Sequence, residues 1–175
     1  EAYTDKRHPD KVIFTQKVEE DLARRDFTIN AIALGLTSHN LELKSSERYK
    51  IQDTRFKIVD PFDGQNNIKN KIIKAVGDPE KRFNEDALRL MRAVRLSAQL
   101  DFEIEPKTKE AIKSKANLLK MITHERVRDE LIKMIDSDNA EKGIILMQDL
   151  GLLKIVLPEV AEGMGVTQNK HHIYT

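Results

Sequence analysis

The segment from Glu85 to Gln99 constrains the fold of this chain more than any other part of the sequence. It predicts one helix, with Asn84 as its N-cap and acidic residues in its first turn. When the charged residues are set aside, the remaining positions are apolar on almost every side of the helix: Leu88, Leu90, Met91, Ala93, Val94, Leu96 and Ala98. Because helices of this kind lie inside a protein, we expect this one to be buried on most sides.

The secondary structure that the sequence predicts changes near residue 77, from a mixture of strands and helices to helices. Before this point the sequence predicts a short helix at 19–24, a polar surface segment at 37–50, and short strands at 12–14, 29–36, 56–59 and 72–76. After it the pattern is helical almost to the end. We therefore predict an α+β chain, with a mixed region over residues 1–76, an all-helical region over 77–160, and a linker over 161–175.

Single residues predict the ends of the later helices. Asp78 suits an N-cap and Pro79 suits the first position of a helix. Thr123 suits the N-cap of the helix 125–135, and Gly151 is expected to end the helix 138–150. Two prolines mark further changes, since a helix is expected to begin at Pro106 and the helical region to end near Pro158.

Composition limits the classes of protein to which the chain can belong. Of its 175 residues, 34% are charged and the formal net charge is +1, so bulk charge does not indicate a nucleic-acid partner. The sequence has no Cys, which excludes disulfides and thiolate metal sites and is compatible with a cytoplasmic location. No apolar run approaches the roughly 18–20 residues of a membrane span.

The chain does not begin with Met, so we expect a piece of a longer protein. The sequence does not indicate the oligomeric state of that protein.

The first candidate site is the stretch LARRDFTINAIAL at residues 22–34. Charged residues run directly into an apolar segment there, and an arginine fork such as that of Arg25 suits phosphate oxygens. Asp26 could accept a hydrogen bond from a ribose hydroxyl or hold Arg25 in place, and Asn30 could do either of these. The alternative is structural, with Arg25 in an ion pair to Asp26, Glu20 or Asp21 that braces the entrance to a strand.

The second candidate site is a charged row on the predicted helix, made of Asp86, Arg89, Arg92 and Arg95. Steps of three residues slip by roughly 60° around a helix, so neighbours in the row touch and its ends do not. Asp86 and Arg89 offer acceptors beside a donor fork, which can match the Watson–Crick edge of a base, while Arg92 and Arg95 could meet phosphates. The alternative is that Glu85 and Asp86 are simply the acidic residues of a first helical turn.

Three further segments have less specific interpretations. Asp60-Pro61-Phe62-Asp63-Gly64 predicts a bend between a strand and a helix, and its functional alternative is a hinge at Asp60 and Gly64. Glu125-Arg126 with Arg128 and Glu130 indicates an ion-paired start of a helix. Two adjacent histidines, His171 and His172, are weak evidence for a metal, and we assign no metal ligand in this chain.

Together these segments resemble the class II tRNA nucleotidyltransferases, the family of the CCA-adding, CC-adding and A-adding enzymes and of bacterial poly(A) polymerase. Residues 20–31 resemble the family's Glu-Asp-Leu-x-Arg-Arg-Asp-Phe-Thr-x-Asn-Ala motif, and 58–64 its Asp-Pro-Phe-Gly-Gly segment. Glu85, Asp86 and Arg89 match its Glu-Asp-x-x-Arg motif, and residues 124–131 its Glu-Arg-[Ile/Val]-x-x-Glu-Leu helix. The resemblance implies the C-terminal part of a polymerase-β-like head with a small mixed sheet, then a helical neck, and then a linker toward the HD-type domain of some relatives.

The resemblance also implies an activity, the addition of CCA from CTP and ATP to the acceptor end of tRNA. Arg25 and Asp26 would contact the ribose and phosphates, and Asp86 and Arg89 would select the base as a protein template. Arg92 and Arg95 would complete the pocket, and residues 60–64 would form the hinge, although Asp63 stands where the family has Gly. Asn30 and Glu85 would support the site. The family's Mg²⁺ ligands, an Asp-x-Asp pair, are expected upstream of this chain, so we expect the chain alone to be inactive.

Two alternatives to CCA addition remain open at this point. Within the family, the chain could belong to a poly(A) polymerase or to an enzyme that adds only CC or only A. Outside catalysis, it could be a helical RNA-binding module, which would show exposed basic and aromatic positions. Aromatic residues make up only 5% of the sequence, which argues against the module.

Overall fold

The structure, a computed structural model, describes residues 17–36, 56–163 and 165–166. The predictions made for residues 12–14, for 37–50, for His171 and His172 and for most of 161–175 lie outside these ranges. The head elements, in chain order, are α1 (Val18–Ala23), η1 (Thr28–Asn30), β1 (Ala33–Leu36), β2 (Phe56–Val59), α2 (Gly64–Lys69) and β3 (Ile72–Ile73). The later elements are α3 (Pro79–Glu85), α4 (Leu88–Leu100), β4 (Glu103–Ile104), α5 (Pro106–Lys115), η2 (Ala116–Met121), α6 (His124–Ile135), α7 (Ala140–Asp149), α8 (Leu153–Val156) and α9 (Pro158–Gly163).

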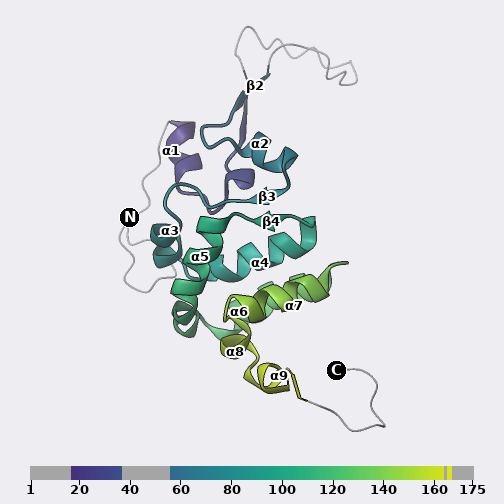
Figure 1. Cartoon of the computed structure of the whole chain (residues 1–175). Coiled ribbons are helices and arrows are strands. Elements are labelled where there is room, and N and C mark those ends of the chain that lie inside the picture. The colour runs from purple at the N-terminus through teal and green to yellow at the C-terminus, as the bar shows by residue number, and fades with distance from the viewer. Residues whose placement is uncertain (1–16, 37–55, 164, 167–175) are drawn as a thin grey trace, which may run out of the picture.

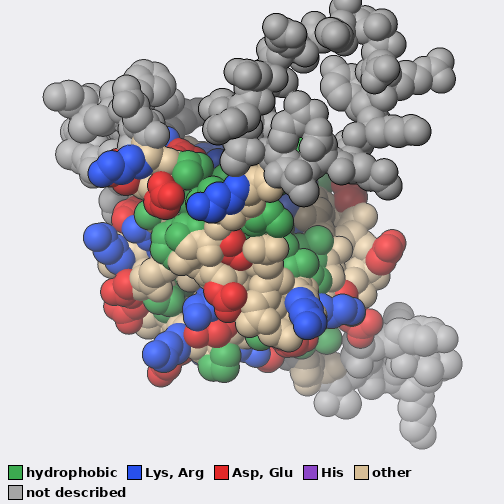
Figure 2. All heavy atoms as spheres, turned by 90° about the horizontal axis from the view of Figure 1, so that it is seen from above, with side chains coloured by type: hydrophobic (Ala, Val, Ile, Leu, Met, Phe, Trp, Pro, Cys, Tyr) green, Lys and Arg blue, Asp and Glu red, His purple; other side chains and the backbone are tan. Residues whose placement is uncertain are grey.

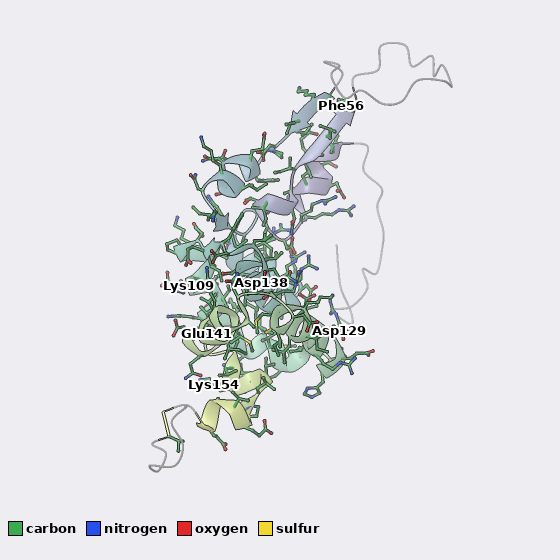
Figure 3. All side chains as sticks on the ribbon, turned by 90° about the vertical axis from the view of Figure 1, so that its right-hand side faces the viewer. Phe56, Lys109, Asp129, Asp138, Glu141 and Lys154 are labelled. Carbon is green, nitrogen blue, oxygen red and sulfur yellow. The ribbon has the colours of Figure 1, made fainter. Side chains whose placement is uncertain are left out.

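The elements stack along one long axis, roughly in chain order. Figure 1 shows α1, β2 and α2 at one end, α3 to α5 in the middle, and α6 to α9 at the other end. Strands β1 and β2 project from the head end, and Phe56, in the last described pair of these strands, lies far from the later helices (Figure 3). This order places the loop after α1 beside the start of α4, where the candidate site lies.

The described strands form two small sheets where the sequence predicted one mixed sheet. β1 pairs with β2 in an antiparallel hairpin, with Ala33 opposite Val59. β3 pairs with β4 in parallel, with Ile72 opposite Glu103. The prediction that residues 77–160 are entirely helical is therefore wrong at β4. This strand has two residues and depends on a partner far away in the sequence, so local periodicity does not reveal it.

Helix α4 is buried on most sides, as its sequence predicts. Leu90, Met91, Ala93 and Val94 are fully buried, and the helix packs against α6 and α7. The predicted start at Glu85 is wrong, because Glu85 ends α3 and Asp86 is extended. The Asp86 side chain accepts a hydrogen bond from the Leu88 N–H at 3.0 Å, so it caps a new helix and separates it from the preceding one.

The other predicted helix ends fall mostly where expected. The Asp78 carboxylate accepts a hydrogen bond from the Glu80 N–H at 3.0 Å, and Pro79 takes the first position of α3. Gly151 follows α7 with a φ of +72°, a conformation that favours glycine. At Pro158 the expectation was a boundary, but this proline instead begins α9, since the first position of a helix needs no N–H donor.

Residues 74–76 fasten the loop after α1 to the helical region. The N–H of Thr28 donates to the carbonyl of Lys74 at 2.9 Å, and that of Val76 donates to the carbonyl of Asp26 at 3.0 Å. From the other side, the N–H of Ala75 donates to the Thr108 hydroxyl of α5 at 3.1 Å. The backbone around Asp26 is therefore held in a fixed position relative to the helices that follow.

Candidate functional site

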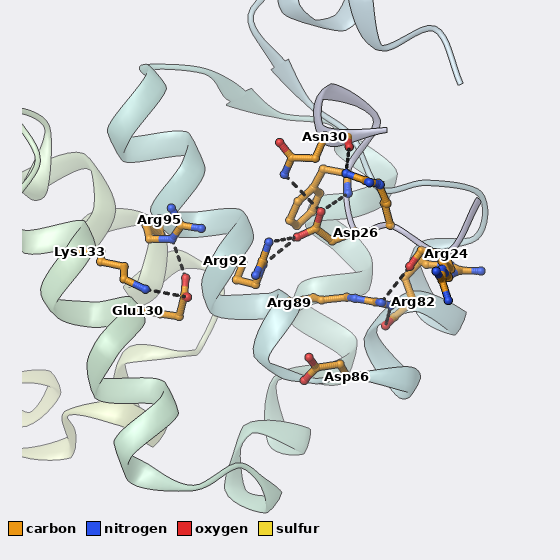
Figure 4. Close-up of polar contacts among 12 residues, drawn as sticks. Arg24, Asp26, Asn30, Arg82, Asp86, Arg89, Arg92, Arg95, Glu130 and Lys133 are labelled. Carbon is orange, nitrogen blue, oxygen red and sulfur yellow. Dashed lines mark hydrogen bonds and ion pairs between the residues drawn. The ribbon is translucent and has the colours of Figure 1, made fainter. Parts of the chain in front are cut away.

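An open cavity of about 550 Å³ lies between the loop after α1 and the start of α4. The residues of the described ranges that line it are all polar: Arg25, Asp26, Asn30, Asp86, Arg89 and Arg92. Three arginines and two aspartates therefore face one space and come from both predicted clusters (Figure 4). Such a lining suits a ligand that carries negative charge and also has polar edges that donate and accept hydrogen bonds.

Asp26 is the buried acidic residue of this cavity, with 8% of its side chain exposed. Its Oδ1 accepts hydrogen bonds from the Phe27 N–H at 2.8 Å and from the Asn30 amide at 3.2 Å. Its Oδ2 contacts the Nε and Nη2 of Arg92 at 2.7 and 2.6 Å. A carboxylate offers about four acceptor positions, so those of Asp26 are all in use. Asp26 thus fixes the direction of the Arg92 guanidinium.

Arg25 is held by partners from its own neighbourhood. Its Nη2 contacts Asp21 at 3.0 Å, and its Nη1 donates to the carbonyl of Asn30 at 3.2 Å. Hydrogen bonds from Arg24 and then Arg25 hold the pKa of Asp21 below its ordinary value. The structural interpretation is therefore correct for the Arg25–Asp21 pair, while Asp26 pairs with Arg92 instead. About half of the Arg25 side chain stays exposed, and it lines the cavity.

Arg89 and Asp86 both line the cavity but are bound to other partners. The Nη1 of Arg89 donates to the carbonyl of Arg82 and to Glu85 Oε2, both at 2.9 Å. Its Nη2 donates to the carbonyl of Arg24 at 3.2 Å. Asp86 accepts from Leu88 through Oδ1 and from Arg126 through Oδ2, at 3.0 and 3.2 Å. Arg89 therefore keeps its Nε–H and one Nη2 proton, and each oxygen of Asp86 keeps one acceptor position.

Arg95 lies apart from the cavity, although the charged row includes it. Its Nε pairs with Glu130 of α6, and its Nη1 donates to Gln99 at 2.6 Å. Figure 4 shows this cluster on the far side of Arg92 from the cavity. Each three-residue step turns the row by roughly 60° and lifts it by about 4.5 Å, so the row leaves the cavity after Arg92. We do not assign Arg95 to the cavity.

The residue that sequence reasoning missed is Arg126, near the start of α6. The expectation for this segment was a locally ion-paired helix start, but Arg126 contacts Asp86, 40 residues earlier. Glu130, one helical turn later, is bound to Arg95. The spacing of Arg126 and Glu130, four residues apart on one helix face, was the available signal, but nothing local identified their partners.

The bend at residues 60–64 has the structure of a tightly packed helix start. The carboxylate of Asp60 accepts from the N–H groups of Gly64 and Gln65 at 2.7 and 2.9 Å. Burial acts to raise the pKa of Asp60, but these hydrogen bonds outweigh it and hold the pKa below its ordinary value. A Cβ on Gly64 would lie 2.2 Å from the carbonyl oxygen of Thr28, so only glycine fits. The segment links β2 to α2, and the hinge stays a prediction.

No metal site can be built from the side chains that the structure describes. Among residues 17–36, 56–163 and 165–166, no group of three or more His, Asp or Glu residues is placed to hold a metal ion. The described residues thus do not fit the Mg²⁺ that the resemblance implies, and we derive no step through a metal here. In the same ranges, no helix is both long and apolar enough to cross a membrane.

Two family models match the chain, and the first of them includes the cavity residues Arg25, Asp26 and Asn30. A model described as the poly A polymerase head domain matches residues 1–74. A model described as the probable RNA and SrmB-binding site of polymerase A matches residues 101–164. These two matches place the chain in the class of the nucleotidyltransferases of the poly(A) polymerase type.

Curated relatives and solved structures give a closer comparison. The CCA-adding enzyme of Lactobacillus helveticus is 52% identical over 133 residues, which are 76% of this chain and 29% of that enzyme. The enzyme of the same name from Listeria monocytogenes is 42% identical over 163 residues, 93% of this chain and 36% of that protein. The structure of the Bacillus stearothermophilus CCA-adding enzyme in complex with CTP matches with a TM-score of 0.66 and 41% identity, over 79% of this chain and 31% of that one.

The Thermotoga maritima CCA-adding enzyme complexed with tRNA matches with a TM-score of 0.64 and 29% identity, over 81% of this chain and 31% of that one. The chain belongs to the family of tRNA nucleotidyltransferases and bacterial poly(A) polymerases. It spans about a third of the length of the curated relatives that it matches.

Proposed function

We propose that this chain supplies the nucleotide-selecting part of an enzyme that adds C, C and A, from CTP and ATP, to the 3′ end of tRNA. The observation that carries the proposal is the cavity in which Asp86 offers acceptors beside the donors of Arg89. The relatives named CCA-adding enzyme, with structures in complex with CTP, with ATP and with tRNA, support the choice of substrates.

The remaining hydrogen-bonding positions of this pair suit the two bases. Cytosine and adenine share one feature on their Watson–Crick edges, an amino group that donates next to a ring nitrogen that accepts. Uracil and guanine present a carbonyl acceptor next to a ring N–H donor instead. Asp86 would receive the amino group, and the Nε–H or the remaining Nη2 proton of Arg89 would reach the ring nitrogen. One arrangement can therefore accept C and A and reject U and G.

The remaining lining residues would hold the sugar and phosphates. Arg92 and Arg25 are the cations of the cavity that suit the triphosphate, while Asp26 and Asn30 suit ribose hydroxyls. Because the acceptor positions of Asp26 are in use, a hydroxyl would have to replace the Asn30 amide or share its place. Glu85 would support the site by holding Arg89.

The reaction itself needs groups beyond the described residues. The 3′-hydroxyl oxygen of the tRNA would lose its proton to solvent and form a bond to the α-phosphorus of the nucleotide. The bond from that phosphorus to the α–β bridging oxygen would break, and pyrophosphate would leave. Mg²⁺ is proposed as the cofactor of the whole enzyme, because this class of phosphoryl transfer uses divalent metal ions. The cytoplasm is the proposed location, which the absence of Cys from the sequence allows. The chain would contribute selection and positioning of the nucleotide.

The non-catalytic alternative, an RNA-binding module, has less support. The described part of the face in Figure 2 carries Lys, Arg, Asp and Glu side chains interspersed, without a continuous basic surface there. A binding module also has no use for an acceptor and donor pair in a cavity whose described lining residues are polar. Both features favour a nucleotide site over a surface that binds only the RNA backbone.

The deciding experiment uses the full-length protein and a tRNA that lacks its terminal CCA. CTP and ATP are supplied singly and together with Mg²⁺, and the products are sequenced. Addition of two C and one A, followed by arrest, is the expected result. Long A tails would indicate a poly(A) polymerase, and two C without A would indicate a CC-adding enzyme. One A on a second tRNA that already ends in CC, without addition to the first tRNA, would indicate an A-adding enzyme. Binding of tRNA without nucleotide transfer would favour the RNA-binding module.

A further inference from the structure

Helix α6 touches the charged row at two points, one helical turn apart. Arg126 donates to Asp86 Oδ2 at 3.2 Å, and Glu130 pairs with Arg95. Residues four apart on a helix share a face, so this face of α6 spans the row from its first member to its last. The two members between them, Arg89 and Arg92, line the cavity instead.

The two contacts have different surroundings and therefore different effects. Glu130 and Arg95 are largely buried and lie outside the cavity lining, so their pair ties α6 to α4. Arg126 and Asp86 each keep 30% of the side chain exposed, and Asp86 lines the cavity. The first contact is a structural tie, while the second acts directly on a group that faces the ligand.

Asp86 and Arg89 are neighbours on the charged row, yet they do not bind each other in the described structure. Asp86 is occupied by the Leu88 N–H and by Arg126, while Arg89 is occupied by Glu85 and two backbone carbonyls. Asp86 lies just before α4 and Arg89 in its first turn, so a carboxylate and a guanidinium without other partners would attract each other there. The outer partners therefore keep the acceptor and the donor from neutralising each other.

We propose that Arg126 is a positioning residue that sets the choice of base. By holding Oδ2 of Asp86, it keeps that carboxylate away from Arg89 and leaves an acceptor position open on each oxygen toward the cavity. Without Arg126, the Asp86 carboxylate turns to Arg89 and accepts its hydrogen bonds. The Arg89 donors that would bind the ring nitrogen of the base are then occupied. The order of acceptor and donor that separates C and A from U and G is then lost. This inference rests on the proposed function of the same cavity.

The test measures selection by the full-length protein with Arg126→Met, which removes the guanidinium and keeps much of the side-chain bulk. The readout is the ratio of kcat/KM for CTP to that for UTP on a tRNA that accepts C. We expect the ratio to fall by about tenfold, the effect of one lost directional contact to a base. Arg126→Lys, which restores the charge without the fork, should recover part of the ratio.

Arg128→Met is the matched control, because Arg128 lies on the same helix and its ion pair in the described structure is with the exposed Asp129. It should leave the ratio unchanged. An equal loss of CTP and UTP addition in Arg126→Met, or an unchanged ratio, would overturn the inference. If Arg126→Met does not fold, Arg126→Gln takes its place, with the same expected fall and the same contradicting outcome. A wild-type protein that adds no nucleotide would refute the proposed function instead, whatever the variants do.

Discussion

Arg92 of α4 and Asp26 of the loop after α1 form an ion pair, with Nη2 and Oδ2 separated by 2.6 Å. The residues are 66 positions apart in the sequence. Arg92 keeps 37% of its side chain exposed to the cavity, while Asp26 is almost entirely buried. The pair therefore joins the mixed region to the helical region and aims a cation into the cavity.

Removing Arg92 should destabilise the protein, because it leaves the buried Asp26 carboxylate without its cation. We expect Arg92→Met to lower the free energy of unfolding by about 2 kcal/mol, less than for a fully buried pair because Arg92 is partly exposed. The double variant with Asp26→Asn should recover part of that loss. Urea unfolding of the four proteins of this cycle measures the coupling, and additive losses would show that the pair contributes nothing.

Removing Asp26 should weaken the selection of ribonucleotides over deoxyribonucleotides. In Asp26→Ala we expect the ratio of kcat/KM for ATP to that for dATP to fall by about tenfold, because a site that binds a hydroxyl rejects the analogue that lacks it. Glu19→Ala, an exposed carboxylate on α1 outside the cavity lining, is the control. An unchanged ratio in Asp26→Ala would remove Asp26 from the sugar site.

The cap at Asp60 predicts a pH-dependent contribution to stability. The folded pKa of Asp60 lies below its ordinary value of 3.8, so its contribution is present above that value and is lost as pH falls through the folded pKa. Asp60→Ala should cost about 1 kcal/mol at pH 7. The difference from wild type should narrow as pH falls below 3.8, in urea unfolding measured from pH 7 to 3.

The exposed Asp138, which has no hydrogen bond or ion pair in the described structure, provides the control for this measurement. Asp138→Ala should change the free energy of unfolding little at either pH. A constant deficit for Asp60→Ala across the whole range would show that its charge does not matter to the cap.

Asp63 stands where the family pattern has Gly, and its backbone conformation explains why both residues suit this position. Asp63 has a φ of +59°, a left-handed conformation that glycine adopts freely and that Asp tolerates. Asp63→Gly should therefore change the free energy of unfolding by less than about 1 kcal/mol. Asp63→Val should cost more than about 1 kcal/mol, because a β-branched residue is strained there. Thermal unfolding of both variants checks this order, and an equal loss in both would contradict it.

The sequence predicted best those features that depend on a single local residue. Asp78 and Gly151 set helix ends through their own side chain or backbone conformation, so their effects were predictable. The break at Asp86 was missed because acidic residues also suit the first turn of a longer helix. Strand β4 was missed because its partner β3 lies about thirty residues earlier in the chain.

The candidate site was predictable in its members but not in its contacts. Arg25 and Asp86 stood out because charge beside apolar sequence is unusual, and the structure brings both to one cavity. Arg95 was predicted to complete the pocket, but it is bound to Glu130 and is not among the described lining residues, because the sequence did not show where the cavity ends along α4. The role of Arg126 at the cavity could not be predicted, since its contact with Asp86 depends on how α6 packs against α4.

The most direct test of the account is base selection by Arg89→Ala in the full-length protein, with Arg95→Ala as the control on the same helix. The readout is kcat/KM for CTP relative to UTP, together with the melting temperature of each protein. We expect Arg89→Ala to lose at least about tenfold in selection, with only a modest change in melting temperature. Arg95→Ala should lose stability and keep its selection, because Arg95 is bound to Glu130 outside the cavity. If Arg89→Ala is destabilised but its residual activity still selects CTP as wild type does, Arg89 does not read the base, and the central claim is wrong.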